Sequence, residues 1–176
     1  VRLIHLFRHS SYNFFDLAMQ EATSYQNFGK YTFMVANGCY AGNFSSIANN
    51  RTTYGERFVL EPGRGSIGYL ALATAGYINP LGRYTEEFYK IAYRDSVGAT
   101  IGNIIAQTIR SYYVDSSYSV PRANQVRENN LQCDPAVRLY HPDGPDLAID
   151  ESSISFTPDN FSSSIDSVQI NVVTRN

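Results

Sequence analysis

Two short hydrophobic runs near the start of the chain each end close to a reactive side chain. Residues 2–7 form the first run and lead to His9, and residues 31–37 form the second and lead to Cys39. Runs of this length and composition predict strands, and the second has the pattern of a buried strand in a parallel sheet. Because open α/β folds place their reactive groups at the carboxyl edge of the sheet, we expect His9 and Cys39 to lie at one edge.

Further along the chain, apolar positions switch between strand and helix spacing up to about residue 140. Small and apolar residues over 65–74 predict a buried strand, and repeats at helical spacing predict amphipathic helices that face the core. We therefore expect, in chain order, a helix over 56–60, the strand over 65–74, helices over 84–92, 101–112 and 121–131, and a short edge strand over 136–139. This order predicts an α/β fold with a mostly parallel sheet flanked by helices.

The composition changes at residues 141–145, which include two prolines, a glycine and an aspartate. Such a cluster predicts a hinge between domains. Beyond the hinge the pattern is strand-like throughout, so the second part of the chain is expected to be all-β. The predicted organisation is an α/β domain over 1–140, a hinge over 141–145 and an all-β segment over 146–176.

Length and charge limit the classes of function. The chain has 176 residues, is 43% hydrophobic and carries a formal net charge of −2, which gives no reason to expect a nucleic-acid partner. No apolar run approaches the roughly 18–20 residues of a membrane span. Val1 leads directly into a strand-like run without a signal-peptide pattern, and we expect the chain to be part of a longer protein.

A cysteine and a histidine at the ends of neighbouring strands suggest a Cys/His dyad for thiolate attack on an acyl group. A lone cysteine is more often a small buried hydrophobic residue, and the spacing alone leaves both interpretations open. His5 lies inside its strand and is expected to be structural, and His141 falls in the hinge. No carboxylates stand at metal-ligand spacing and no glycine-rich loop precedes a helix, so we expect neither a metal site nor a cofactor.

Several segments together point to a family. These are Phe7-Arg-His-Ser-Ser, Phe28-Gly-Lys-Tyr and Ala36-Asn-Gly-Cys-Tyr-Ala-Gly-Asn-Phe44, followed by residues 55–60, 65–71 and 134–139. The pattern resembles the gingipain-type cysteine peptidases, which have the caspase-like fold, and it covers about residues 2–140. Residues 1–140 are thus identified as the C-terminal part of a caspase-like catalytic domain. Residues 146–176 resemble the first strands of an immunoglobulin-like module, too few to close one.

The resemblance implies a cysteine endopeptidase in which His9 is the base and Cys39 is the nucleophile. It also implies that the backbone N–H groups of Ser10 and Cys39 bind the oxyanion. Thr74 and Tyr77, at the carboxyl end of the next strand, are expected to border the substrate. The implied partners are protein or peptide substrates, with secretion machinery as a further partner, and the implied location is secreted or at the cell surface.

Two positions depart from the family pattern. Arg8 stands where the family usually has a glycine before the histidine, and Cys133 stands where the family usually has a glycine. The alternative function keeps the fold and loses the chemistry, as a non-catalytic surface protein or type IX secretion component with a vestigial Cys/His pair. Arg8 favours that alternative, whereas the presence of both His9 and Cys39 favours the enzyme.

Overall fold

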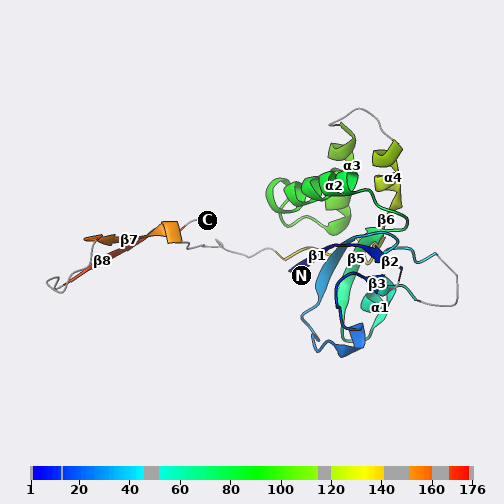
Figure 1. Ribbon diagram of the computed structural model, residues 1–176, viewed down its shortest axis with the longest axis horizontal. Coiled ribbons are helices and arrows are strands. Elements are labelled where there is room, and N and C mark those ends of the chain that lie inside the picture. The colour runs from blue at the N-terminus through cyan, green and yellow to red at the C-terminus, as the bar shows by residue number, and fades with distance from the viewer. Residues whose placement is uncertain are drawn as a thin grey trace. The chain divides into compact units, whose positions relative to one another are not determined.

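The computed structural model describes residues 2–12, 14–45, 52–114, 120–140, 151–159 and 167–174. The chain divides into two compact units, Val1–Tyr140 and His141–Asn176, and each is described by itself. The larger unit has mixed α/β structure, with helices on both sides of a central sheet (Figure 1).

The central sheet has four strands in the order β1-β4-β5-β6, with bounds β1 (Arg2–Phe7), β4 (Thr32–Asn37), β5 (Ser66–Leu72) and β6 (Asn129–Gln132). The first three strands run parallel, and β6 pairs antiparallel with β5 at the edge. The expected mostly parallel sheet is therefore confirmed.

Strand β4 lies at the centre of the larger unit and is buried on both faces. Phe33 and Val35 point to one face and Met34 and Ala36 to the other, as the two-residue period of a strand requires. All four side chains are at most 5% exposed. A strand buried on both faces is apolar throughout, which is why the sequence indicated it clearly.

One face of the sheet is covered by α2 (Ile78–Lys90), the π-helical turn η2 (Ile91–Asp95) and α3 (Ile101–Val114). Phe88, Ile91 and Ile104 from these elements pack against Phe33 and Val35. Helix α4 (Val120–Glu128) lies on the same side of the sheet in Figure 1. The helical stripes predicted over 84–92 and 101–112 thus face the core, as expected.

The opposite face is covered by α1 (Tyr54–Leu60), the short turn η1 (Ala22–Ser24) and the hairpin β2 (Ser10–Ser11) with β3 (Phe14–Phe15). Tyr54 and Phe58 of α1 pack against Met34 and Tyr69. Helix α1 begins at a capping box: the Thr53 hydroxyl accepts from the Glu56 amide, while the Glu56 carboxylate accepts from the Thr53 amide.

The expected edge strand over 136–139 is wrong, and β6 takes its place. The predicted helix over 121–131 ends at Glu128, and the next four residues pair with β5. These residues (Asn-Asn-Leu-Gln) are mostly polar and half-buried, so they lack a strand's hydrophobic pattern; backbone pairing at the sheet edge defines them. Residues 136–139 instead follow a turn at Asp134 and make a single bridge, Thr100 to Arg138.

The smaller unit contains the turn η3 (Glu151–Ser153) and an antiparallel hairpin of β7 (Ile154–Thr157) and β8 (Gln169–Val172). Both strands confirm the strand-like pattern expected beyond the hinge. Most of their side chains are exposed. The predicted hinge over 141–145 and the first five residues of the expected all-β segment, 146–150, lie outside the described residues. The immunoglobulin-like module stays a prediction.

The position of Phe33 predicts a large stability loss on truncation. The side chain of Phe33 projects from β4 toward the helices α2 and α3 and is fully buried. Phe33→Ala should therefore lower the free energy of unfolding by about 3–5 kcal/mol. Phe28→Ala is the matched control: Phe28 is 82% exposed, and its truncation should stay within about 0.5 kcal/mol. Denaturant unfolding of the whole protein measures both, and equal losses would contradict the assigned core.

Candidate functional site

The parallel register of β1 and β4 brings the two predicted reactive residues to one edge. The last residue of β1, Phe7, is the register partner of Asn37, the last residue of β4. His9 and Cys39 each follow two residues later, and the Arg8 amide still donates to the Asn37 carbonyl at 3.2 Å. His9 and Cys39 therefore leave the sheet at the same carboxyl edge.

The loops that carry these two residues are in direct contact. The Ser10 hydroxyl donates to the Cys39 carbonyl oxygen at 2.9 Å, and the bond is partly buried. Gly38 allows this approach, because a Cβ there would overlap the Ser10 hydroxyl and come within 2.7 Å of the Arg8 carbonyl oxygen. The close fit joins the loop after β1 to the loop after β4.

The backbone takes an unusual conformation directly after Cys39. Among the residues that the structure describes, Tyr40 is the one non-glycine residue with positive φ, at 58°. A bulky side chain rarely adopts this region, which costs about 1–3 kcal/mol. The Tyr40 amide donates to the Thr74 carbonyl at 2.8 Å, and the Gly42 amide donates to the Leu72 carbonyl at 2.7 Å, so β5 and the loop after it hold the strained turn.

The two reactive side chains differ in exposure. The Cys39 thiol is half-buried, with its Sγ 4.0 Å from the Gly76 carbonyl oxygen, whereas His9 is exposed. Both cysteines of the chain are free thiols. Burial and the neighbouring Asp134 carboxylate raise the pKa of Cys133 to about 11, so this second thiol is largely unreactive at neutral pH.

The loop after β5 lies beside the Cys39 loop, and the predicted substrate-binding residues lie on it. The Thr74 carbonyl accepts a hydrogen bond from the Tyr40 amide, and Tyr77 is 61% exposed at the start of α2. An open concavity of about 630 Å³ lies between the end of β1 and the first turns of α2. Its lining comprises Phe7, Ile78, Asn79, Gly82, Arg83 and Glu86.

A buried polar contact behind this edge was not expected from the sequence. The Asn37 amide nitrogen is 3.0 Å from His5 Nε2 and also donates to the Thr85 hydroxyl of α2. Since an amide nitrogen can only donate, the contact requires a neutral His5 ring with Nε2 as acceptor. Burial lowers the pKa of His5, which favours that form. The structural role expected for His5 is consistent with this bond.

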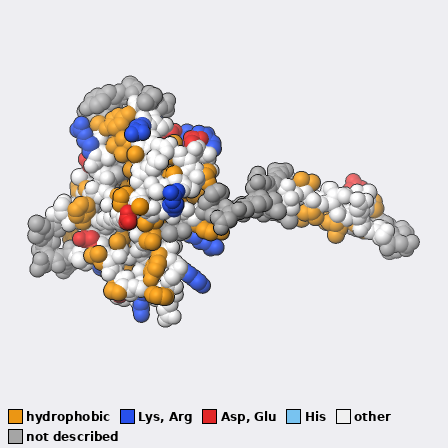
Figure 2. Space-filling view, turned by 180° about the vertical axis from the view of Figure 1, so that it is seen from behind, with side chains coloured by type: hydrophobic (Ala, Val, Ile, Leu, Met, Phe, Trp, Pro, Cys, Tyr) orange, Lys and Arg blue, Asp and Glu red, His pale blue; other side chains and the backbone are white. Residues whose placement is uncertain are grey.

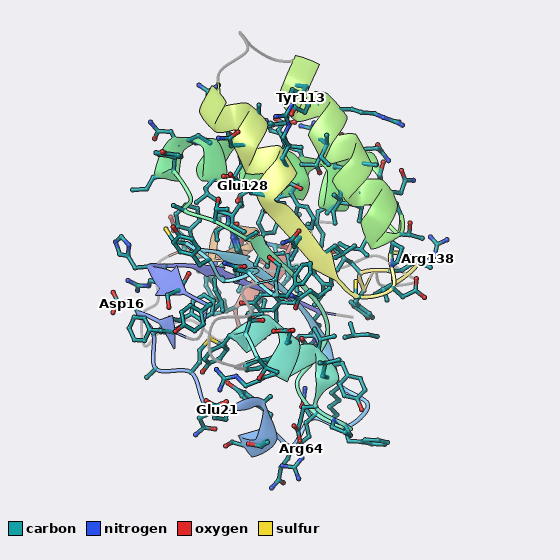
Figure 3. The ribbon with its side chains drawn as sticks, turned by 90° about the vertical axis from the view of Figure 1, so that its right-hand side faces the viewer. Asp16, Glu21, Arg64, Tyr113, Glu128 and Arg138 are labelled. Carbon is teal, nitrogen blue, oxygen red and sulfur yellow. The ribbon has the colours of Figure 1, made fainter. Side chains whose placement is uncertain are left out.

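Arg8 and Asp16 show how the backbone turn at His9 is formed. Arg8 does not have positive φ, so the turn needs no glycine at this position. The Asp16 amide donates to the His9 carbonyl at 2.8 Å, while the Asp16 side chain is exposed on the β2–β3 hairpin (Figure 3). The hairpin, which the sequence pattern did not indicate, therefore supports His9 through its backbone.

The surface of the larger unit shows no concentrated charge on the face seen in Figure 2, where Lys and Arg side chains are dispersed among apolar ones. Within the described ranges, no group of three or more His, Cys, Asp or Glu is arranged to hold a metal ion. Among the described helices, none is both long and apolar enough to span a bilayer.

The close approach at Gly38 predicts that Gly38→Ala separates the two loops. The added Cβ overlaps the Ser10 hydroxyl and crowds the Arg8 carbonyl, so we expect a loss of about 1–3 kcal/mol in the free energy of unfolding. Gly82→Ala is the control, because open space surrounds Gly82 in α2, and it should be neutral or stabilising by up to about 1 kcal/mol. Denaturant unfolding compares the two, and a neutral Gly38→Ala would contradict the contact.

The lowered pKa of His5 predicts a pH-dependent stability. Because the pKa of His5 is lower in the folded chain than in the unfolded chain, the unfolded chain binds more protons at His5 as the pH drops. The free energy of unfolding should therefore fall as the pH drops below about 6.5. His5→Gln keeps an acceptor but removes the titration, and its stability should fall less between pH 7 and pH 5. The reference is the free energy of unfolding at pH 8, where His5 is neutral in both the folded and the unfolded chain. Identical pH profiles of stability for the wild type and His5→Gln would contradict a lowered pKa of His5.

Residues 1–140 match the model of Peptidase family C25. A solved structure described as a protease matches with a TM-score of 0.65 at 11% identity, over 89% of this chain and 41% of that one. The Arg-specific cysteine proteinase gingipain R matches with a TM-score of 0.64 at 15% identity, over 85% of this chain and 36% of that one.

The two structural matches show that the fold is similar to the caspase-like fold of gingipain, as the sequence predicted. The chain spans less than half of the length of either solved chain. No curated protein sequence matches it. Because the family model covers most of the chain, the chain belongs to Peptidase family C25.

Proposed function

We propose that this chain carries the catalytic pair of a cysteine endopeptidase, with Cys39 as nucleophile and His9 as base. The observation that supports it most is the contact between their two loops. Strands β1 and β4 end at register partners, and His9 and Cys39 each follow two positions after the end of their strand. The Ser10 hydroxyl donates a hydrogen bond to the Cys39 carbonyl. Membership of Peptidase family C25 supports the same class of chemistry.

The reaction proceeds through a thioester. The Cys39 thiolate attacks the scissile carbonyl carbon, and the electron pair of the C=O bond moves onto its oxygen. The C–N bond then breaks, and His9 passes a proton to the leaving amine. Water, deprotonated by His9, attacks the thioester and releases the new carboxyl group and the thiol. No cofactor is needed for any of these steps.

The oxyanion donors in this proposal are the backbone N–H groups of Cys39 and Ser10. The Cys39 N–H makes no hydrogen bond within the described part of the chain. In an antiparallel pair, residues alternate between bonded and unbonded partners. Because the Asp16 amide bonds the His9 carbonyl, Ser10 and its partner Phe15 form an unbonded pair, and the Ser10 N–H points away from β3. Both donors thus remain available to a substrate oxygen.

The substrate in this proposal is a protein or peptide chain that lies along the loop after β5. Thr74 and Tyr77 border it there, since the Thr74 carbonyl contacts the Cys39 loop and Tyr77 is exposed beside it. By the family resemblance, the protein acts outside the cell or at its surface and encounters secretion machinery on the way.

The alternative is a non-catalytic surface or secretion component that keeps the peptidase fold. Arg8, which stands where the family usually has a glycine, favours this alternative in the sequence. The Arg8 backbone has ordinary φ, so this substitution leaves the histidine turn unstrained. The strained Tyr40 and the tight Gly38 contact favour the enzyme, because neither is needed for a stable core.

The proposal predicts that Cys39→Ala lowers kcat on peptide substrates by about 10⁴-fold or more, as removal of a nucleophile does in catalytic units. His9→Ala should produce a loss of similar size. Cys133→Ala is the matched control and should retain activity, because that thiol lies outside the site and is largely protonated. Peptide hydrolysis by the whole protein measures all three. Full activity of Cys39→Ala would contradict the assignment of Cys39 as the nucleophile. A wild-type protein without peptidase activity would favour the non-catalytic alternative.

A further inference from the structure

One side-chain hydrogen bond joins the loop of the proposed base to the proposed nucleophile. The Ser10 hydroxyl, on the residue directly after His9, donates to the Cys39 carbonyl oxygen at 2.9 Å. We propose that the Ser10 side chain is a positioning residue, which holds His9 and Cys39 in the geometry that proton transfer requires. This inference rests on the proposed function and is separate from the oxyanion role of the Ser10 backbone N–H.

The bond fixes a single peptide plane from both ends. The carbonyl of the Cys39–Tyr40 peptide accepts from the Ser10 hydroxyl, and its N–H donates to the Thr74 carbonyl at 2.8 Å. Because a peptide unit is planar, two bonds at opposite ends set its orientation. The orientation of this peptide plane helps to set the positive φ of Tyr40, a conformation that persists only where its surroundings enforce it. The Ser10 bond is one of these restraints.

The hydroxyl also continues the link between two strands where their backbones separate. The β1–β4 ladder reaches Phe7 and Asn37, and the Arg8 amide makes one more bond to Asn37. Beyond that point the chain turns into β2, and the Ser10 hydroxyl supplies the next link between the loops. Gly38 leaves the space for it.

His9 is held from its other side by the hairpin. The His9 carbonyl accepts a hydrogen bond from the amide of Asp16, directly after β3, at 2.8 Å, so the hairpin supports the residue before Ser10. This bond sets the histidine backbone relative to the hairpin, whereas the Ser10 bond sets the hairpin relative to Cys39. Removal of the hydroxyl would leave the hairpin intact and loosen its position against the thiol.

Loss of the Ser10 hydroxyl should therefore impair catalysis without an equally large effect on folding or substrate binding. Misplacement of a reacting group by about 1 Å costs about 10²-fold in rate. For Ser10→Ala we expect kcat on fluorescein-labelled casein to fall by about 10- to 100-fold, while KM changes by less than about threefold. The variant keeps the backbone N–H, so the oxyanion donor is unaltered.

Ser96→Ala is the matched control. Its hydroxyl donates to the Gln107 side chain at 2.9 Å, is also partly buried, and links η2 to α3 away from Cys39. Each variant loses one partly buried hydrogen bond from a serine hydroxyl to an amide carbonyl oxygen, so their unfolding midpoints should fall by similar amounts. Ser96→Ala should retain wild-type kcat.

The rate of Cys39 alkylation by iodoacetamide tests whether Ser10 acts through His9. We expect His9→Ala and Ser10→Ala each to slow the reaction in the whole protein. In the His9→Ala background, the added Ser10→Ala change should alter the rate by less than about twofold, because a positioning residue has no effect once the positioned group is absent.

Each outcome decides between the two proposals. If His9→Ala slows alkylation but Ser10→Ala does not, the positioning role is overturned and the peptidase proposal stands. An equal effect of Ser10→Ala with and without His9 would also overturn it, as would a Ser96→Ala variant with the same loss of kcat. If His9→Ala leaves Cys39 alkylation unchanged, the dyad itself is overturned, and the inference with it.

Discussion

The close approach of the two loops at Gly38 is the constraint on which the candidate site depends. The register of β1 and β4 sets His9 and Cys39 at equal distance beyond the sheet. Register alone would leave the loops free to diverge, since each continues in a different direction. Only an absent side chain at position 38 lets the Ser10 hydroxyl reach the Cys39 carbonyl. The site thus combines a long-range pairing with one local steric requirement.

The polar contact of Asn37 protects that register. In a parallel sheet, a slip by one residue turns every side chain of a strand to the opposite face. A slipped β4 would move Asn37 away from His5 and Thr85 and leave a buried amide unpaired, which costs about 1–3 kcal/mol. We infer that this contact disfavours the slipped pairing and so keeps the two reactive residues level. Its position at the last residue of β4 couples the register to the site.

The sequence predicted the parts of the fold that burial determines. Residues 2–7, 31–37 and 65–74 became β1, β4 and β5, and the shared edge of His9 and Cys39 followed from those strands. Strand β6 could not be predicted, because backbone pairing at an edge, and not an apolar pattern, defines it. The Ser10 bond and the Tyr40 conformation could not be predicted either, since both depend on contacts between residues far apart in the sequence.

Three departures from local sequence preference lie directly beside Cys39, and this supports the proposed function over a vestigial pair. Tyr40 has a backbone that a bulky residue avoids, Asn37 is a buried polar residue at the end of an apolar strand, and Gly38 permits a contact that no other residue would. Natural sequences depart from local preference mainly at functional sites. All three residues lie within two positions of Cys39 along the chain. A vestigial pair would gain nothing from strain beside it, so selection for stability alone would be expected to remove these features first.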